Sequence, residues 1–274
     1  GPGTLRVVGE LKDGRGRRVR ELWSAPFERR RFGWERSVVG ELSEDEVLPP
    51  FTPLRVGRAS VSCWGREYRF AADGWPATIR TRGANVLAGT VRLEAVVDGR
   101  PARLVAATGW KLQRARRGAV TFRAETKDPA ARVLVSGQVE FDGTIFYRLA
   151  LAPRRPLRVD ALRLVIPLKA RHARLFHVAR NKIRLTNEAG AVPPGQGRVW
   201  GSGDRKGRAV RGTFAPYIWV GDHDRGLCWM AQSDRGWSVP HDEDVLELSR
   251  RGDAVELIVH LFRRPRTLVG RWEA

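Results

Sequence analysis

Apolar and polar residues alternate with a period of two in most of the longer apolar runs, and this alternation limits what the chain can fold into. The clearest runs are Val91–Val97 and Val120–Ala124, and the pattern recurs in 133–141, 145–151, 157–167 and 255–261. Successive side chains of a strand point to opposite faces of a sheet, so these runs predict half-buried antiparallel strands. No stretch of about twelve residues shows a clear 3.6-residue apolar stripe, which predicts few and short helices.

Turn signals separate these runs. Asp98-Gly99, Asp142-Gly143 and Arg251-Gly252-Asp253 each stand between two apolar segments. Asp-Gly favours a tight hairpin because both residues tolerate a positive φ, so a hairpin is expected at Asp142-Gly143. Short strands with frequent turns are typical of a sandwich. The sequence therefore predicts an all-β fold, a large antiparallel β-sandwich of the supersandwich kind with few short helices.

The length of 274 residues, with 42% apolar residues, allows a sizeable core. We expect residues 1–274 to form a single β-sandwich domain. The segment 192–211 is rich in glycine, proline and charge, which predicts a long exposed loop.

The formal net charge of +20 comes almost entirely from arginines that are spread along the chain. The basic segment Gly14–Arg18 lacks the interleaved aromatic residues of many nucleic-acid contacts. We therefore expect no nucleic-acid partner and place most arginines on solvated strand faces. A sulfated or otherwise acidic ligand is the alternative explanation of the charge.

The cysteines and the chain start say little about location. Cys63 and Cys228 are too few for a disulfide scaffold, and they form either one long-range pair or two free thiols. No apolar run approaches the ~20 residues of a membrane helix, so no membrane span is expected. The chain opens Gly1-Pro2-Gly3 without methionine, so we expect the natural start to lie outside it. The compartment stays open, with a secreted or periplasmic location among the options.

The segment Phe214–Trp237 concentrates tryptophans, aspartates and turn glycines. Within it, 221–226 predicts a tight turn between two strands, because aspartate caps its own backbone and glycine accepts positive φ. One interpretation is a polar hairpin tip with Trp219 and Trp229 packing on either strand. The other is carbohydrate binding, since aromatic faces stack on sugar rings while carboxylates and guanidinium groups bind hydroxyls. The candidate binding residues are Trp229, Trp237, Asp234, Arg235, Asp222 and Asp224.

No other motif indicates catalysis or a bound ion. The aspartates could supply oxygen ligands to Ca²⁺, but their spacing fits no EF-hand loop. The histidines form no pair suited to zinc, and the serines stand in no nucleophile elbow. We therefore expect no metal, no cofactor and no catalytic residue in this chain.

Three segments in this order and spacing carry a resemblance to a known family. They are Phe32–Arg36 with Val47–Leu54 and Cys63–Tyr68, then Asp160–Leu168, then Phe214–Trp237. Together they resemble the N-terminal β-sandwich region of glycoside hydrolase family 123 proteins, which include β-N-acetylgalactosaminidases. The resemblance runs from about Leu5 to Glu273.

The resemblance implies that the chemistry belongs to a C-terminal (β/α)8 barrel, where an adjacent Asp-Glu pair supports substrate-assisted hydrolysis. Asp242-Glu243 and Glu44-Asp45-Glu46 contain such a dipeptide, but no barrel strand precedes either. Gln232 stands where relatives more often carry glutamate, which weakens a ligand role at that position. The chain stops about where the barrel is expected to begin.

The resemblance therefore implies a non-catalytic accessory domain that braces the barrel and lines its carbohydrate cleft. This chain alone is expected to be inactive, and its parent protein is expected to be a β-N-acetylhexosaminidase-type glycoside hydrolase. The expected partners are the barrel of the same protein and carbohydrate. The alternative is a free-standing glycan-binding module for acidic or sulfated carbohydrate.

Overall fold

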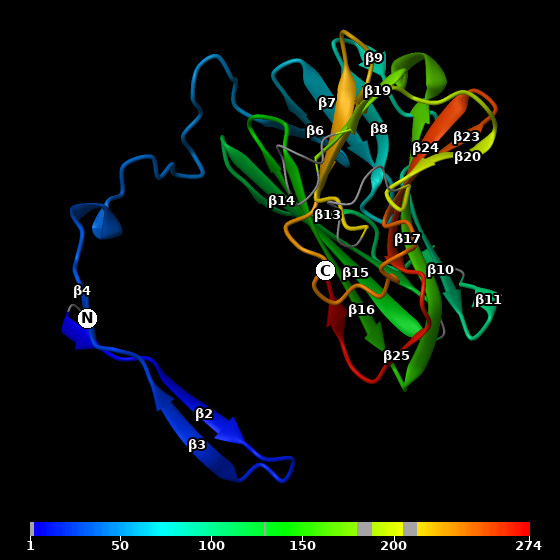
Figure 1. Cartoon of the computed structure of the whole chain (residues 1–274). Coiled ribbons are helices and arrows are strands. Elements are labelled where there is room, and N and C mark those ends of the chain that lie inside the picture. Colours follow the sequence, from blue (N-terminus) through cyan, green and yellow to red (C-terminus); the bar gives the residue numbers. More distant parts are fainter. Residues whose placement is uncertain (1–2, 103, 129, 180–187, 205–212) are drawn as a thin grey trace. The chain divides into compact units, whose positions relative to one another are not determined.

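Antiparallel strands make up most of the regular structure in the computed structural model, which describes residues 3–102, 104–128, 130–179, 188–204 and 213–274 (Figure 1). Within these ranges the helices are the two short 3-10 helices η1 (Gly33–Arg36) and η2 (Ala170–His172), and neither has the length and apolar character to span a lipid bilayer. The predicted all-β, sandwich-like class is confirmed. The chain divides into two units, Gly1–Ser43 and Glu44–Ala274, which are described separately.

The first unit, over its described residues 3–43, contains two strand pairs and one 3-10 helix. Its elements are β1 (Gly3–Leu5), β2 (Val8–Lys12), β3 (Arg18–Trp23), β4 (Phe27–Arg29) and η1 (Gly33–Arg36). β1 pairs with β4, and β2 pairs with β3. The turn between β2 and β3 is closed by Asp13, whose Oδ1 accepts hydrogen bonds from the N–H groups of Arg15 and Arg17. None of the described residues of this unit is buried.

The described residues of the second unit form four antiparallel sheets. Its first strands are β5 (Arg55–Gly57), β6 (Ser60–Cys63), β7 (Arg66–Phe70), β8 (Pro76–Thr81), β9 (Ala84–Asn85), β10 (Arg92–Val97), β11 (Arg100–Pro101), β12 (Val105–Ala106), β13 (Lys111–Ala115), β14 (Ala119–Lys127), β15 (Ala131–Glu140) and β16 (Ile145–Pro153). They are followed by β17 (Leu157–Lys169), η2 (Ala170–His172), β18 (Leu175–Ala179), β19 (Glu188–Ala191), β20 (Gly197–Gly201), β21 (Tyr217–Gly221), β22 (Gly226–Met230), β23 (Leu246–Arg251), β24 (Ala254–Phe262), β25 (Arg266–Leu268) and β26 (Trp272–Glu273).

The order of strands within each sheet joins segments that are distant in the chain. Among the described residues, one sheet has the order β11-β10-β17-β24-β23-β20, with β25 also paired to β17. A second has the order β12-β14-β15-β16-β26, with β13 paired to β14. The other two are β5-β6-β7-β8-β9 and β19-β18-β21-β22.

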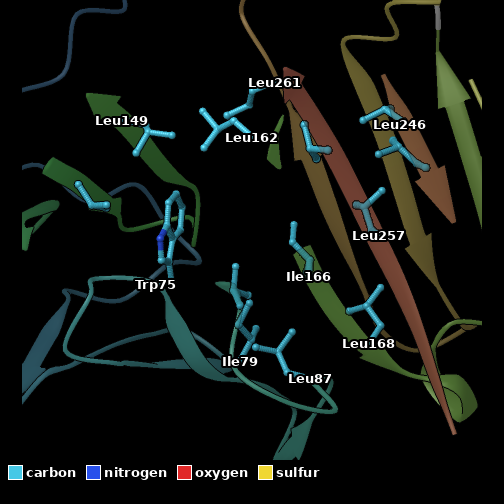
Figure 2. Packing of buried hydrophobic residues seen from close by; sticks show 14 of the residues in the cluster. Trp75, Ile79, Leu87, Leu149, Leu162, Ile166, Leu168, Leu246, Leu257 and Leu261 are labelled. Carbon is cyan, nitrogen blue, oxygen red and sulfur yellow. The ribbon is translucent and has the colours of Figure 1, made fainter. Parts of the chain in front are cut away.

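The inward faces of these sheets meet in one apolar core. Inward residues alternate with outward ones along β14 and β15, as in Val133, Val135 and Val139. Figure 2 shows part of this core, where side chains from β8, β16, β17, β23 and β24 gather. Phe122, Leu162, Ile218, Leu257 and Phe262 are among its fully buried members.

The strands predicted from alternation are confirmed, with ends that differ by a few residues. The hairpin at Asp142-Gly143 is also confirmed, because β15 pairs with β16 and Gly143 has φ +88°. Its loop is one residue longer than an Asp-Gly turn alone, since the N–H of Glu140 donates to the carbonyl of Thr144 at 2.9 Å. A longer loop with glycine in the left-handed region is the common alternative to the two-residue turn.

The predicted long loop over 192–211 is wrong in part. Its residues Gly197–Gly201 form β20, which pairs with β23 and buries Trp200. The glycine, proline and charge content of the segment gave no sign of this strand, because the burial of Trp200 depends on pairing with β23, which is distant in the sequence. Residues 205–211 of that loop lie outside the described residues. The prediction of a single domain over 1–274 stays a prediction.

Candidate functional site

The Phe214–Trp237 segment is built around the β21–β22 hairpin, and the hairpin register decides which way its aromatic side chains point. Trp219 lies opposite Cys228, and Ile218 lies opposite Trp229. Ile218 is fully buried, so Trp229 shares the inward face of the hairpin and Trp219 has the outward one. Trp219 and Trp229 lie on the two strands of the hairpin, as the hairpin interpretation expects, and the register adds that their side chains point to opposite faces of the sheet.

Asp222 closes the tip of the hairpin. Its Oδ1 accepts hydrogen bonds from the N–H groups of Asp224 and Arg225, each at 2.8 Å. Its Oδ2 lies 2.8 Å from Nδ1 of His172, which follows β17 in η2. Arg171 Nε donates to Nε2 of the same ring, so Nδ1 carries the proton and donates to Asp222. Through these hydrogen bonds Asp222 connects η2 to the tip of the hairpin.

The electrostatics of Asp222 follow from these contacts. Burial raises the pKa of its carboxyl, but hydrogen bonds from His172 and from two backbone N–H groups outweigh that effect and lower the pKa to about 2. The carboxylate is therefore charged across the neutral range. Because both its oxygens already accept hydrogen bonds, it is poorly placed to become a cation ligand or a sugar contact.

The tip also depends on close contact with a tryptophan ring. A Cβ placed on Gly226 would lie 2.6 Å from Trp219 Nε1, and one on Gly221 would collide with the same ring. Both glycines are thus required by the position of Trp219. Asp224, in contrast, is exposed at the tip.

Trp229, Trp237 and Phe214 form an aromatic cluster at the margin of the core. The ring centroids of Trp229 and Trp237 are 6.2 Å apart, and those of Phe214 and Trp237 are 5.8 Å apart in an edge-on arrangement. All three are partly buried and pack against the core. The structure therefore brings together the two tryptophans among the six candidate binding residues.

The segment that carries Trp237 is hydrogen-bonded to two residues near the end of the chain, Arg266 and Trp272. Trp272 Nε1 donates to the carbonyl of Gly236 at 2.8 Å, and Arg266 Nη1 donates to the same oxygen at 2.6 Å. Gly236 has φ +85°, and an added Cβ would lie 3.0 Å from Trp272 Nε1. The position of Trp237 is therefore set by residues about thirty places later in the chain.

The predicted binding residues fall into two groups. Asp234 and Arg235 are exposed in the turn between Trp229 and Trp237. Asp222 and Asp224 lie at the other end of the hairpin, beyond the pair Gly221–Gly226, which is itself three paired positions, or roughly 10 Å along a strand, from Trp229. The six residues therefore do not line one shared surface.

The outward face of the same sheet is a second aromatic surface, which the sequence analysis missed. It consists of His177, Tyr217, Trp219, Cys228 and Met230, and we call it the outer aromatic face. The rings of His177 and Tyr217 are 5.7 Å apart, and Met230 is 59% exposed. The sequence contained a signal for this face. Tyr217 and Trp219 are two residues apart in one apolar run, Cys228 and Met230 are two residues apart in the next, and side chains two apart on a strand share a face.

The cysteines stand apart as free thiols. Cys63 is buried and Cys228 is exposed on the outer aromatic face. Burial raises the pKa of both thiols. The open choice between a disulfide and two free thiols is thus resolved in favour of free thiols.

The adjacent Asp-Glu dipeptides hold turns in place. Glu44 pairs with Arg114 at 2.7 Å, and Asp45 Oδ1 accepts a hydrogen bond from the N–H of Arg117. Asp242 and Glu243 are exposed before β23, where Glu243 lies 3.6 Å from Arg263. These contacts give the acidic runs a structural role within the second unit.

The sequence analysis also missed a pocket beside β10. Its charged lining residues are Asp73, Arg92, Glu94 and Arg163, and its volume is about 530 Å³. Arg92 and Glu94 are two residues apart in one strand, so they share a face of the sheet. Their spacing was visible in the sequence, but the approach of Asp73 and Arg163 was not.

The fold and these surfaces define an all-β domain with aromatic surfaces at the edge of its core. The family model described as glycoside hydrolase 123, third domain, matches residues 54–235, which is more than half of the chain. The chain belongs to glycoside hydrolase family 123. The match leaves Phe32–Arg36 and Trp237 outside it, and the predicted N-terminal position of the domain stays a prediction. No curated protein matches the chain.

Proposed function

We propose that this chain is a non-catalytic accessory domain of a family 123 glycoside hydrolase and that it braces the catalytic domain. The observation that carries the proposal is the outer aromatic face. Its sheet is covered by the core on one side, while Tyr217, Trp219 and Met230 remain partly exposed on the other. Exposed apolar patches of this kind usually mark contact surfaces.

Two buried acidic residues, Asp244 and Glu247, fit a structural role better than a catalytic one. A general acid in glycoside hydrolysis needs a raised pKa so that it can donate a proton. Burial raises the pKa of the Asp244 carboxyl, but hydrogen bonds from Arg198 and Gly203 lower it overall. The pKa of Glu247 is lowered by its hydrogen bond to His260. These carboxylates are held charged by the fold and serve its stability.

The arginine contacts favour bracing over recognition of a polyanion. Many arginine side chains form ion pairs with acidic residues of the same domain, as Arg92 does with Glu94 and Glu256 and Arg132 does with Glu125. The aromatic cluster of Phe214, Trp229 and Trp237 lies at the edge of the core, where it could line a carbohydrate cleft of the catalytic domain. We therefore place carbohydrate contact second to bracing.

A first test uses the chain alone with a chromogenic N-acetyl-β-galactosaminide. We expect no turnover above the buffer rate. Turnover that is lost in Asp73→Asn or Glu94→Gln would contradict a non-catalytic role.

A second test locates the bracing surface. Met230→Arg is placed on the outer aromatic face, and Phe146→Arg, at a side chain 55% exposed on β16, is the matched control. In this chain alone both changes should alter the free energy of unfolding by less than about 0.5 kcal/mol. In the longest natural polypeptide that contains the chain, Met230→Arg should shorten the thermal half-life of hydrolase activity while Phe146→Arg leaves it unchanged. Equal half-lives for the two variants would remove the outer aromatic face from the proposal.

A further inference from the structure

The outward side of the sheet that contains β13, β14, β15 and β16 carries a group of exposed cations. Phe122 and Val135 point into the core, so the residues that alternate with them along β14 and β15 point outward. β14, β15 and β16 run side by side in Figure 1, where they are drawn in green. The exposed outward cations, which we call the basic face, are Lys111, Arg123, Lys127 and Arg148.

Strand register brings three of these cations into one row. Lys111 lies opposite Arg123, Arg123 lies opposite Ser136, and Ser136 lies opposite Arg148. Neighbouring strands are about 4.8 Å apart, so the row spans roughly 14 Å across the sheet. Lys127 lies farther along β14, at roughly 13 Å from Arg123. The basic face is therefore a broad cationic surface and not a single point charge.

This arrangement costs stability, because cations stand directly opposite each other. Lys111 faces Arg123, and Lys127 faces Arg132. Like charges in directly opposite positions of a sheet are destabilising. Arg132 is neutralised by Glu125, since its Nε donates to Oε1 at 2.7 Å and its Nη2 donates to Oε2 at 2.8 Å. No carboxylate of the described residues neutralises Lys111 or Arg123 in this way.

The basic face thus differs from the ion-paired arginines described above. Its four cations form no ion pair with any described residue. The residues outside the described ranges include no aspartate or glutamate, so they cannot supply the carboxylates either. Besides Glu125, the outward carboxylate of β14 and β15 is Glu140, which accepts a hydrogen bond from Gln138 at 2.9 Å. The positive charge of the basic face is therefore left for a partner outside the domain.

An exposed aromatic ring adjoins the row of cations. Phe146 is 55% exposed and lies two residues before Arg148, on the same outward side of β16. Cations beside an exposed apolar ring suit the surface of an anionic bilayer, where the cations attract lipid phosphates and the ring enters the headgroup layer.

Other anionic partners fit this surface less well. A soluble phosphate contacts only adjacent cations of a row that continues across several strands. Single-stranded nucleic acid is usually held by several stacking rings. Within the described strands β13–β16, Phe146 is the one aromatic residue on the outward side.

We propose that the basic face and Phe146 dock on an anionic lipid bilayer through its phosphate groups. The cations of neighbouring strands bind phosphates of neighbouring lipids, and the negative surface offsets the repulsion between Lys111 and Arg123. This interaction goes beyond the bracing role and does not depend on it, because the basic face and the outer aromatic face share no residue.

The test is flotation of the whole chain with vesicles of phosphatidylcholine alone and with vesicles of equal parts phosphatidylcholine and phosphatidylglycerol. Binding to the anionic vesicles alone is expected, and it should weaken as salt is added. Arg123→Gln combined with Arg148→Gln should weaken that binding at least tenfold, since each cation near an anionic surface contributes about fivefold. The melting temperature should not fall, because the change removes a cation that faces Lys111.

The matched control is Arg55→Gln combined with Arg58→Gln. It lowers the net charge equally by removing two exposed arginines at β5 and the turn after it, which have no ion pair with a described residue. This control should bind like the unmodified chain, whereas Phe146→Ala should weaken binding severalfold. Equal weakening in the two double variants would assign the binding to net charge and overturn the proposal.

Three further results overturn the proposal. One is an absence of binding to the anionic vesicles. Another is release from them by inorganic phosphate at an ionic strength at which sodium chloride releases nothing, which would assign the face to a soluble phosphate. The third is tighter binding of single-stranded DNA that the Arg123 and Arg148 changes abolish. None of these results affects the bracing role, since that role is tested by the half-life of hydrolase activity in the longer polypeptide.

Discussion

His172 Nδ1 lies 2.8 Å from Asp222 Oδ2, and this contact joins the 3-10 helix η2 to the tip of the β21–β22 hairpin across 50 residues of sequence. The two side chains are 9% and 12% exposed. The contact is therefore shielded from competing water. It connects two elements whose contact no sequence pattern predicts.

Asp222→Ala should destabilise the second unit by about 1–3 kcal/mol, because it removes a part-buried acceptor and leaves His172 and two backbone N–H groups without it. Asp224→Ala is the matched control at the same tip, and its exposed side chain should change stability by less than about 0.5 kcal/mol. Urea unfolding followed by tryptophan fluorescence measures both. Equal losses of unfolding free energy in the two variants would show that the hydrogen bonds of Asp222 do not stabilise the fold.

The contribution of Asp222 should also depend on pH. Its pKa is lowered in the folded chain from the ordinary value of 3.8 to about 2, so the folded state binds the proton less readily than the unfolded state. The resulting stability is fully present well above 3.8 and disappears as the pH falls through about 2. The difference in unfolding free energy between the unmodified chain and Asp222→Ala should therefore shrink as the pH falls through this window. A difference that grows on acidification would contradict the assignment.

Gly137→Val should destabilise the β14–β15 pair by about 2–3 kcal/mol or more through overpacking. Gly137 lies opposite Phe122, whose ring covers the glycine so closely that an added Cβ would collide with it. Phe122 is 1% exposed and cannot move into solvent without opening the core. Gly270→Ala, at an exposed glycine with no atom near the added Cβ, serves as the control. Thermal unfolding by circular dichroism compares the two, and unchanged melting of Gly137→Val would disprove the packing argument.

Arg198→Met should cost about 2–3 kcal/mol, because it leaves the buried carboxylate of Asp244 without its charged partner. Arg198 Nε donates to Asp244 Oδ2 at 2.6 Å, and the Asp244 side chain is 6% exposed. The arginine itself is 41% exposed, so the effect should fall below that of a fully buried pair. Arg69→Met breaks the exposed pair with Glu67 and should have little effect. The double variant Arg198→Met with Asp244→Asn should lose less than the sum of the two single changes, and strict additivity would argue against coupling.

Much of the strand content was predictable because the signal is local. The alternation in 133–141 and 145–151 needs only the geometry of a single strand and a nearby turn, and both strands and their hairpin are confirmed. The predicted loop over 192–211 was wrong where Trp200 is buried, because that burial comes from pairing with β23, some fifty residues later.

That the six candidate residues bind carbohydrate stays a prediction, and the structure shows only how they are arranged. The sequence analysis grouped Trp229 with Trp237, and their rings pack against each other. It also grouped them with Asp222 and Asp224, although the hairpin register carries these aspartates to the opposite end. Proximity in sequence is a poor guide along an extended strand, because each residue adds about 3.3 Å of length.

The sequence by itself determined the all-β class, the main strands and the acid-capped turns, since these follow from side-chain periodicity and from backbone preferences of single residues. The tertiary structure alone decided that Asp222 meets His172, that Phe122 requires glycine at position 137, and that Asp73 and Glu94 line one pocket. Such contacts depend on which strands become neighbours. That choice is made by burial of the whole core, to which every sheet of the second unit contributes.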